Sequence, residues 1–241
     1  MDKKVVLISG ASRGIGAAIA MHLASLGYKV IGTARSEFKF DKPSDNLIPL
    51  KLDITCRESI KNCAAKLKEQ NLLPDILINN AGIAVSKSSL NTSMEDWDNV
   101  MNTNLRGVFM CSKLFSKHLV DNKKSGKIIN ISSIAAEKVL GHRLSSYCAS
   151  KAAVSHLTRT LANEYAKYNI QVNAIAPGYI LTDLNKSFFD TDEGKEMIEL
   201  IPQKRIGFAE ELDGALLLLC SDAGSFMTGS IIRVDGGHVI G

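Results

Sequence analysis

The stretch "SGASRGIG", Ser9–Gly16, decides the fold of this 241-residue chain. A short apolar run precedes it at 5–8, and a helical pattern begins near Gly14. Its three glycines have a G-x-x-x-G-x-G spacing, which lets the backbone turn sharply and approach a pyrophosphate at a helix N-terminus. We therefore predict a strand, a phosphate-binding turn and a helix; a tight strand–helix turn without a ligand is the alternative.

The same alternation of Val- and Ile-rich runs with helical patterns continues along the chain. The predicted strands are 5–8, 30–33, 47–52, 76–78, 127–131, 171–175 and 231–234, and the predicted helices are 14–26, 58–70, 94–120, 147–167 and 210–221. Strands this apolar are covered on both faces, so we expect one α/β domain over 1–241, with a parallel sheet of about seven strands flanked by helices. Segment 181–203 breaks the alternation and is expected to form a substrate-binding lid, or else a plain pair of surface helices.

The composition excludes several classes of function. Hydrophobic residues make up 45% of the chain and charged residues 22%, as in a globular protein, and the net charge of +4 is scattered rather than gathered in a basic stripe, which argues against nucleic-acid binding. The five cysteines have no C-x-x-C spacing, so neither a metal site nor a disulfide framework is expected, and a cytoplasmic location is the default. The apolar runs are too short for a signal sequence or a membrane span.

The end of the second predicted strand, "VIGTARSE" at 30–37, bears on the coenzyme. A carboxylate there would bind the ribose hydroxyls of NAD, but Thr33, Ala34 and Arg35 occupy that place. The guanidinium groups of Arg35 and Arg13 suit the 2′-phosphate of NADP, so we expect NADP rather than NAD. Glu37 is the one feature that would reverse this expectation; alternatively, Arg35 and Glu37 are solvated loop residues.

Two further strand ends carry polar groups. Asp53, in "LKLDIT", would accept a hydrogen bond from an adenine amino group or else cap a helix that begins near Thr55. "NNAG", 79–82, offers amides for a buried polar network and a glycine that permits close backbone approach.

A tyrosine and a lysine stand four residues apart in "SSYCASKAA", 145–153. Positions i and i+4 share one face of a helix, so Tyr147 and Lys151 are expected to lie side by side. The pair by itself is also compatible with an ordinary surface contact.

These motifs, in this order, resemble those of the short-chain dehydrogenase/reductase family. The resemblance rests on "SGASRGIG", "NNAG", Asn104 in "NTNLRG", "NISS" ending at Ser133, "YCASK" and "PGYILT" at 177–182, and it covers essentially the whole chain. It implies a Rossmann-like fold and an NADP-binding site. The implied cofactor-binding residues are Gly10, Ser12, Arg13, Gly14, Ile15, Gly16, Arg35, Asp53, Ile54, Asn80, Ala81, Gly82, Tyr147, Lys151, Pro177, Gly178, Ile180 and Thr182.

The resemblance also implies a catalytic role for Asn104, Ser133, Tyr147 and Lys151. Tyr147 would be the general acid/base, and lowering its pKa by about 3 units from about 10 corresponds to roughly 4 kcal/mol. Lys151 would supply much of this, with help from the charge of the nicotinamide ring in the oxidised cofactor. Lys151 would also hold the nicotinamide ribose, Ser133 would steady the carbonyl oxygen, and Asn104 would hold a water that connects Lys151 to solvent.

The spacing departs from the family in one place. Ser133 lies fourteen residues before Tyr147, where the family has thirteen, so Ser132 is a second candidate. The two side chains point to opposite faces of a strand, and we favour Ser133. His142 and Leu144, in the loop before Tyr147, are candidates for lining the substrate pocket.

The expected function is reduction of a ketone, most similar to 3-oxoacyl-[acyl-carrier-protein] reductases. A sugar or polyol dehydrogenase of the same family is the alternative, and a non-catalytic NADP-binding regulator is a third, disfavoured because all four catalytic residue types are present. The family implies a homotetramer built through 94–120 and 147–167. Ala152, Val154, Leu157, Leu161 and Ala162, together with the apolar C-terminal tail, offer more apolar surface than one chain needs.

Overall fold

The computed structural model describes residues 4–141, 143–183 and 185–241. Its centre is a seven-stranded sheet in the order β3-β2-β1-β4-β5-β6-β7, with every neighbouring pair parallel. The strands are β1 (Val5–Ser9), β2 (Lys29–Ala34), β3 (Leu47–Lys51), β4 (Ile76–Asn79), β5 (Gly126–Ile131), β6 (Ile170–Pro177) and β7 (Ile231–Val234). The predicted doubly wound parallel α/β fold is thus confirmed, and each predicted strand lies within two residues of its observed bounds.

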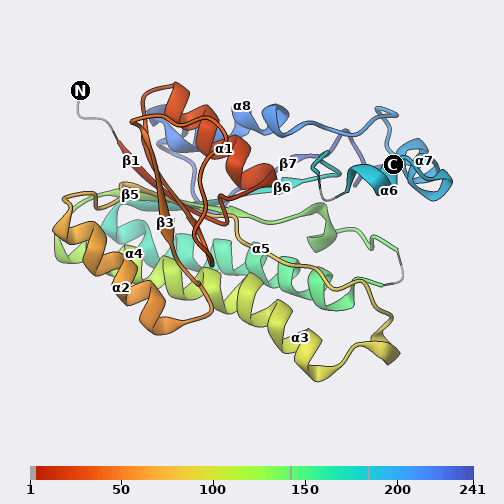
Figure 1. The fold of residues 1–241 in the computed structure, drawn as a ribbon, viewed down its shortest axis with the longest axis horizontal. Helices are drawn as coiled ribbons and strands as arrows, with labels where there is room; N and C mark the ends of the chain where they lie inside the picture. Colours follow the sequence, from red (N-terminus) through yellow and green to blue (C-terminus); the bar gives the residue numbers. More distant parts are fainter. Residues whose placement is uncertain (1–3, 142, 184) are drawn as a thin grey trace.

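Helices cover both faces of this sheet (Figure 1). They are α1 (Gly14–Ser25), α2 (Arg57–Glu69), α3 (Met94–Met101), α4 (Val108–Asp121), α5 (Ser145–Tyr165), α6 (Lys186–Phe189), α7 (Asp192–Glu199) and α8 (Asp213–Cys220). Helices α1 and α8 lie on one face, and α2, α4 and α5 lie on the other (Figure 1). Across the described ranges, no helix is both long enough and apolar enough to cross a membrane.

The side chains of the strands pack into two separate hydrophobic cores, one on each face of the sheet. Along β4, Ile76 and Ile78 pack toward α1 and α8, while Leu77 between them packs toward α2, α4 and α5. All three are at most 1% exposed. Burial on both faces explains why the strands read as continuous apolar runs rather than as an alternating pattern.

The predicted helix over 94–120 is confirmed as helical throughout, but it is not a uniform α-helix. Helix α3 ends at Met101, a π-helical segment follows at Asn102–Gly107, and α4 begins at Val108. A π-helical segment adds a residue to a turn and is stabilised by tertiary contacts rather than by local propensity. The apolar periodicity of the sequence therefore cannot reveal it.

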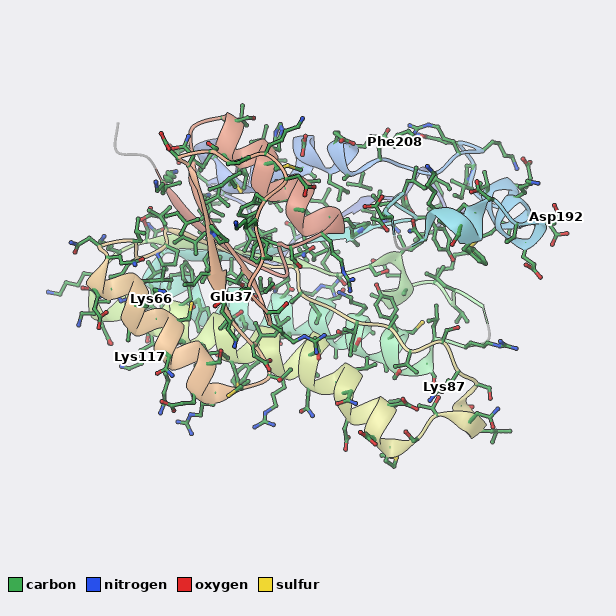
Figure 2. All side chains as sticks on the ribbon, in the orientation of Figure 1. Glu37, Lys66, Lys87, Lys117, Asp192 and Phe208 are labelled. Atoms are coloured by element: carbon green, nitrogen blue, oxygen red, sulfur yellow. The ribbon has the colours of Figure 1, made fainter. Side chains whose placement is uncertain are left out.

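The segment 181–203 holds the short helices α6 and α7, with Leu184 outside the described residues. Thr191 caps α7 by accepting a hydrogen bond from the Gly194 N–H at 3.1 Å. These helices lie beside the C-terminus at one end of the sheet, and Figure 2 labels Asp192 on α7 there.

The surplus of apolar surface predicted on α5 is smaller than expected. Val154, Leu161 and Ala162 are buried within the chain against the sheet and its neighbouring helices. Ala152 is exposed and Leu157 is partly buried. Only these two of the five predicted residues remain accessible for contact with another chain.

Candidate active site

The candidate site lies at the carboxyl ends of the strands, where the strand order reverses. Strand β1 pairs with β2 on one side and with β4 on the other, so the connections leave in opposite directions and open a crevice. A cavity of about 690 Å³ occupies this place. All eighteen residues that the sequence analysis expected to bind the cofactor line this cavity. Ser133 lines it too, whereas Asn104 does not.

The glycine turn shapes the floor of the cavity. Gly10 has φ +71°, and a Cβ there would lie 2.7 Å from the Ala81 Cα. A Cβ on Gly16 would lie 2.1 Å from the Gly10 carbonyl oxygen, which itself accepts a hydrogen bond from Asn80 Nδ2 at 2.8 Å. Only glycine fits at these two positions, so the backbone of β1 and α1 forms the surface that a ligand meets.

The N-terminus of α1 has the features of a phosphate site. Its first turn contains no acidic residue, and Arg13, the residue before the helix, makes no side-chain capping bond. The first backbone N–H groups of a helix have no intrahelical acceptors and carry a partial positive charge. The residues present therefore fit a dinucleotide pyrophosphate.

The adenosine end of the cavity is bordered by two exposed arginines, Arg13 and Arg35. Glu37, which would have reversed the coenzyme expectation, instead lines a different cavity between β3 and α2. Asp53 Oδ1 accepts hydrogen bonds from the Thr55 N–H at 2.9 Å and the Thr55 hydroxyl at 2.7 Å. A helix does begin near Thr55, at Arg57, but Asp53 does not cap it, because the N-cap residue of α2 is Cys56 and Asp53 closes the turn before it.

Tyr147 and Lys151 lie on one face of α5, with the Lys151 Nζ 5.7 Å from the centre of the Tyr147 ring. The ammonium donates a hydrogen bond to the Ile131 carbonyl at the end of β5, at 2.7 Å. Burial lowers the pKa of Lys151 from 10.5 to about 8 because water no longer solvates the charge. Charge and hydrogen bond therefore tie α5 to the sheet directly beside the tyrosine.

The pKa of Tyr147 differs from the sequence expectation. Burial raises it above 10, a hydrogen bond with the Ser133 side chain opposes the increase, and the nearby Cys148 adds to it. The lowering expected from Lys151 is absent, because the lysine directs its ammonium at Ile131 and is itself penalised by burial. Tyr147 is a protonated phenol at neutral pH, which is the form that donates a proton.

The two candidate serines face different surroundings. Ser132 also lines the cavity, but its hydroxyl hydrogen-bonds Ser155 Oγ at 2.7 Å and donates to the Lys151 carbonyl at 3.2 Å. Ser133 instead faces Tyr147, and its Oγ accepts a hydrogen bond from the Ala135 N–H at 3.1 Å. Of the two, only Ser133 has its hydroxyl beside the phenol.

Asn104 occupies the π-helical segment and reaches the strand β4 connection. Its Oδ1 accepts from the Ile83 N–H and its Nδ2 donates to the Ile83 carbonyl, both at 2.9 Å. Nδ2 also donates to Ser150 Oγ on α5 at 3.0 Å. Asn104 thus holds the chain just after "NNAG" against α5, a positioning contact that the sequence did not reveal.

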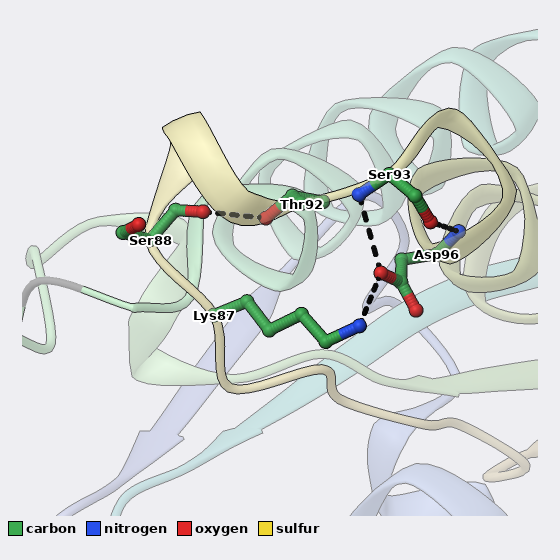
Figure 3. A network of polar contacts seen from close by, with 5 residues as sticks. All are labelled: Lys87, Ser88, Thr92, Ser93 and Asp96. Carbon is green, nitrogen blue, oxygen red and sulfur yellow. Dashed lines mark hydrogen bonds and ion pairs between the residues drawn. The ribbon is translucent and has the colours of Figure 1, made fainter.

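A capping network fixes the start of α3, the helix that leads into this segment (Figure 3). The Ser93 hydroxyl accepts from the Asp96 N–H at 3.0 Å, and Asp96 Oδ2 accepts from the Ser93 N–H at 3.2 Å. Lys87 pairs with the same Asp96 oxygen at 2.6 Å, and this hydrogen bond is the main reason that the pKa of Asp96 is lowered. The cap anchors α3 at the end opposite to the π-helical segment.

The sequence analysis did not identify most of the apolar lining of this cavity. Besides Leu144, which was a sequence candidate, the cavity is lined by Ile83, Ala84, Ile134, Leu140 and Tyr179. Tyr179 stood inside the quoted "PGYILT" motif, whereas the others carry no local signal because loops from different parts of the chain bring them together. His142, the other loop candidate, lies outside the described residues.

A cavity with a helix N-terminus at one end and a tyrosine–lysine pair at the other defines a dinucleotide-dependent oxidoreductase. Comparison with known proteins supports this class: the family profile described as Enoyl-(Acyl carrier protein) reductase matches residues 10–238. This chain belongs to the short-chain dehydrogenase/reductase family.

Its relatives have diverse substrates. The chain is 37% identical to an NAD-dependent glycerol dehydrogenase of Listeria innocua, over 98% of this chain and 94% of the relative. It is also 37% identical to a 3-oxoacyl-[acyl-carrier-protein] reductase of Escherichia coli, over 98% and 97%. A solved structure described as a 2-deoxy-D-gluconate 3-dehydrogenase from Agrobacterium tumefaciens, with bound NADP, has 37% identity and a TM-score of 0.90, covering 100% of this chain and 97% of that one.

The buried ammonium generates a test of stability. With the pKa of Lys151 lowered from 10.5 to about 8, keeping it charged costs about 3 kcal/mol below pH 8. Lys151→Met removes this cost and one hydrogen bond worth about 1 kcal/mol, so its Tm at pH 7 should exceed that of wild type by a few degrees. As the pH rises from 8 to 10.5, Lys151 loses its proton in the folded wild type and burial no longer destabilises it. The difference in Tm between the variant and wild type should therefore shrink over this pH range. Calorimetry at pH 7 and pH 10 measures both values, and a lower Tm for the variant at pH 7 would contradict the assignment.

Proposed function

We propose that this protein reduces a ketone to a secondary alcohol with NADPH. The observation that supports this most is the convergence of Ser133, Tyr147 and Lys151 on the cavity that also contains the glycine turn. When bound, NADPH supplies the hydride that adds to the carbonyl carbon. The Tyr147 hydroxyl donates its proton to the carbonyl oxygen, and the Ser133 hydroxyl hydrogen-bonds that oxygen as negative charge develops on it.

The other two residues serve this proton transfer. Lys151, with its Nζ 5.7 Å from the centre of the Tyr147 ring, would hold the nicotinamide ribose when the dinucleotide is bound. Its positive charge would then stabilise the phenolate that remains after Tyr147 has given its proton to the substrate. Asn104 fixes the backbone at Ile83 and, with its second lone pair on Oδ1, holds a water on the route from Lys151 to solvent.

The substrate chain we favour is apolar, as in a 3-oxoacyl thioester. Ile83, Ala84, Ile134, Leu140 and Leu144 are apolar residues of the cavity lining and would contact such a substrate. The amide of Asn185, which also lines the cavity, is already used by the Thr182 N–H and the Ile180 carbonyl, both at 2.8 Å. It is therefore not free to bind the hydroxyls of a sugar, and segment 181–203 would close over the substrate as a lid.

Tyr179 and the relatives support the second candidate, a sugar or polyol dehydrogenase. The Tyr179 ring lies at the cavity wall and offers one hydroxyl to a polyhydroxy substrate. A panel of acetoacetyl thioesters, glycerol and keto-gluconates, assayed with NADPH and NADH, separates the two candidates. If the protein turns over none of these compounds, the result contradicts both enzyme candidates and favours the non-catalytic NADP-binding regulator.

The proton donor is tested by Tyr147→Phe. Removing the hydroxyl should lower kcat by at least about 10²-fold, because general acid catalysis contributes about that much. Dinucleotide affinity, measured by fluorescence titration, should change less than about threefold. Tyr168→Phe, at an exposed tyrosine, is the matched control and should have wild-type kcat. Near-normal turnover by Tyr147→Phe would remove this residue from the mechanism.

Coenzyme choice is tested by Arg35→Asp. Two guanidinium groups at the adenosine end favour the 2′-phosphate of NADP, so wild type should have a higher kcat/KM with NADPH than with NADH. The variant should narrow or reverse this ratio. Glu37→Gln should leave the ratio unchanged, because Glu37 lines another cavity. A wild-type preference for NADH would refute the proposal.

We further propose a homotetramer, in a reducing cytoplasmic setting that suits five free cysteines. Ala152 and Leu157 on α5, Phe109 on α4 at 42% exposure, and Ile240 in the tail at 82% supply apolar contact surface. Light scattering should give four times the chain mass of 26.1 kDa. A monomer mass at micromolar concentration would refute both interfaces, and a dimer mass would leave one.

A further inference from the structure

A second cavity lies between α2 and α4, on the same face of the sheet as α5. Its volume is about 280 Å³. The two helices run side by side against the same face of the sheet (Figure 1). The large apolar side chains in its lining include Leu7, Leu52, Ile60, Leu67, Leu114 and Phe115.

This cavity reaches the central strand of the sheet. Leu7 in β1 is only partly buried, although its neighbours Val6 and Ile8 are 0% exposed. Short side chains explain the gap: Ala64 and Cys63 on α2 face Cys111 on α4. Protein interiors rarely leave such space, and a cavity of about 150 Å³ already binds benzene. The gap is therefore large enough for an organic ligand.

Apart from Lys68, Lys117, His118 and Asp121, the side chains that line this cavity are apolar or thiols. Burial raises the pKa of Cys63 to about 11 and that of Cys111 to about 12, so both thiols are neutral. Carbon and neutral sulfur surround the interior, and the part of a ligand that enters must be apolar. Taking a methylene as similar to a water molecule at about 30 Å³, the space holds a chain of roughly eight to ten carbons.

The rim, in contrast, is cationic. Lys68 on α2 lines the mouth, and in the described part of the chain it has no ion-pair partner. Lys117 on α4 pairs with Asp121 at 3.0 Å, and both line the same mouth. Lys68 and Lys124 also lower the pKa of His118, after burial as the largest cause. Figure 2 labels Lys66 and Lys117 on this same side of the molecule.

We propose that the α2–α4 cavity binds one medium-length aliphatic carboxylate, with its chain against Leu7 and Leu52 and its carboxylate beside Lys68. Apolar walls select the chain, and the unpaired ammonium at the mouth selects the negative head. Leu52 also lines the dinucleotide cavity, so one side chain separates the two sites. The proposal does not depend on which ketone the enzyme reduces.

Decanoate, below its micelle concentration, is the probe, and isothermal titration calorimetry measures its binding to the full chain. Ala64→Phe fills the cavity from α2, and Lys68→Glu reverses the charge at its mouth. Ala84→Phe is the matched control, because it narrows the wall beside Tyr147 and leaves the α2–α4 cavity intact. Decylammonium, with the same chain and the opposite charge, tests the head group.

Wild type and Ala84→Phe should bind one decanoate per chain with equal affinity. Ala64→Phe and Lys68→Glu should bind at least about tenfold more weakly, and decylammonium should bind wild type at least about tenfold more weakly than decanoate does. Loss of binding in Ala84→Phe would place decanoate in the catalytic cavity and overturn the proposal. It is equally overturned by wild-type binding in Ala64→Phe or Lys68→Glu, or by no binding to wild type. Should Ala64→Phe fail to fold, as judged by circular dichroism, Lys68→Glu decides.

Discussion

The active site depends on one buried charge, the Lys151 ammonium held at the end of β5. Its hydrogen bond to the Ile131 carbonyl joins the first turns of α5 to the strand that carries Ser132 and Ser133. A lysine side chain that is only 5% exposed is energetically unfavourable, and such a cost is retained where function requires the charge. The position of Tyr147, one turn earlier on the same helix, follows from that anchor.

A chain of buried polar contacts extends this seam between the strands and α5. Asn79 Nδ2 donates to Asn130 Oδ1 at 2.9 Å, and Asn130 Nδ2 donates to Thr158 Oγ1 on α5 at 2.9 Å. Ser132 binds Ser155 one turn earlier on the helix. Buried polar groups need partners, so these contacts define one register of α5 on the sheet, whereas apolar packing would tolerate several. Catalytic geometry at the top of α5 is thereby supported along the length of the helix.

The two faces of the sheet are packed differently. On the face of α1 and α8, close backbone approach at Gly10 and Gly16 leaves space for a ligand but none for a side chain. On the face of α2 and α4, small side chains leave a gap that reaches Leu7. Both cavities share Leu52, which lies in the short connection between the end of β3 and the start of α2. The adenosine end of the site and the gap between the helices are therefore parts of one continuous packing arrangement.

The sequence by itself determined the strand–helix alternation, the glycine turn and the Tyr147–Lys151 pair, because each depends on residues that are close in the chain. Period, glycine spacing and the i, i+4 relation are local properties, and they placed all seven strands. They also placed the glycine turn, Asp53 and Asn79 at one rim, since the carboxyl ends of parallel strands meet there, whereas the full set of cofactor-binding residues came from the family resemblance.

Only the tertiary structure decided the features that arise between distant segments. The π-helical segment at Asn102–Gly107 forms where Asn104 bonds to Ile83 and where Gly107 leaves no room for a Cβ beside Ile54. The outward direction of Glu37 and the raised pKa of Tyr147 likewise depend on which elements surround each group. Burial and long-range hydrogen bonds set these features, and neither is encoded in a residue's immediate neighbours.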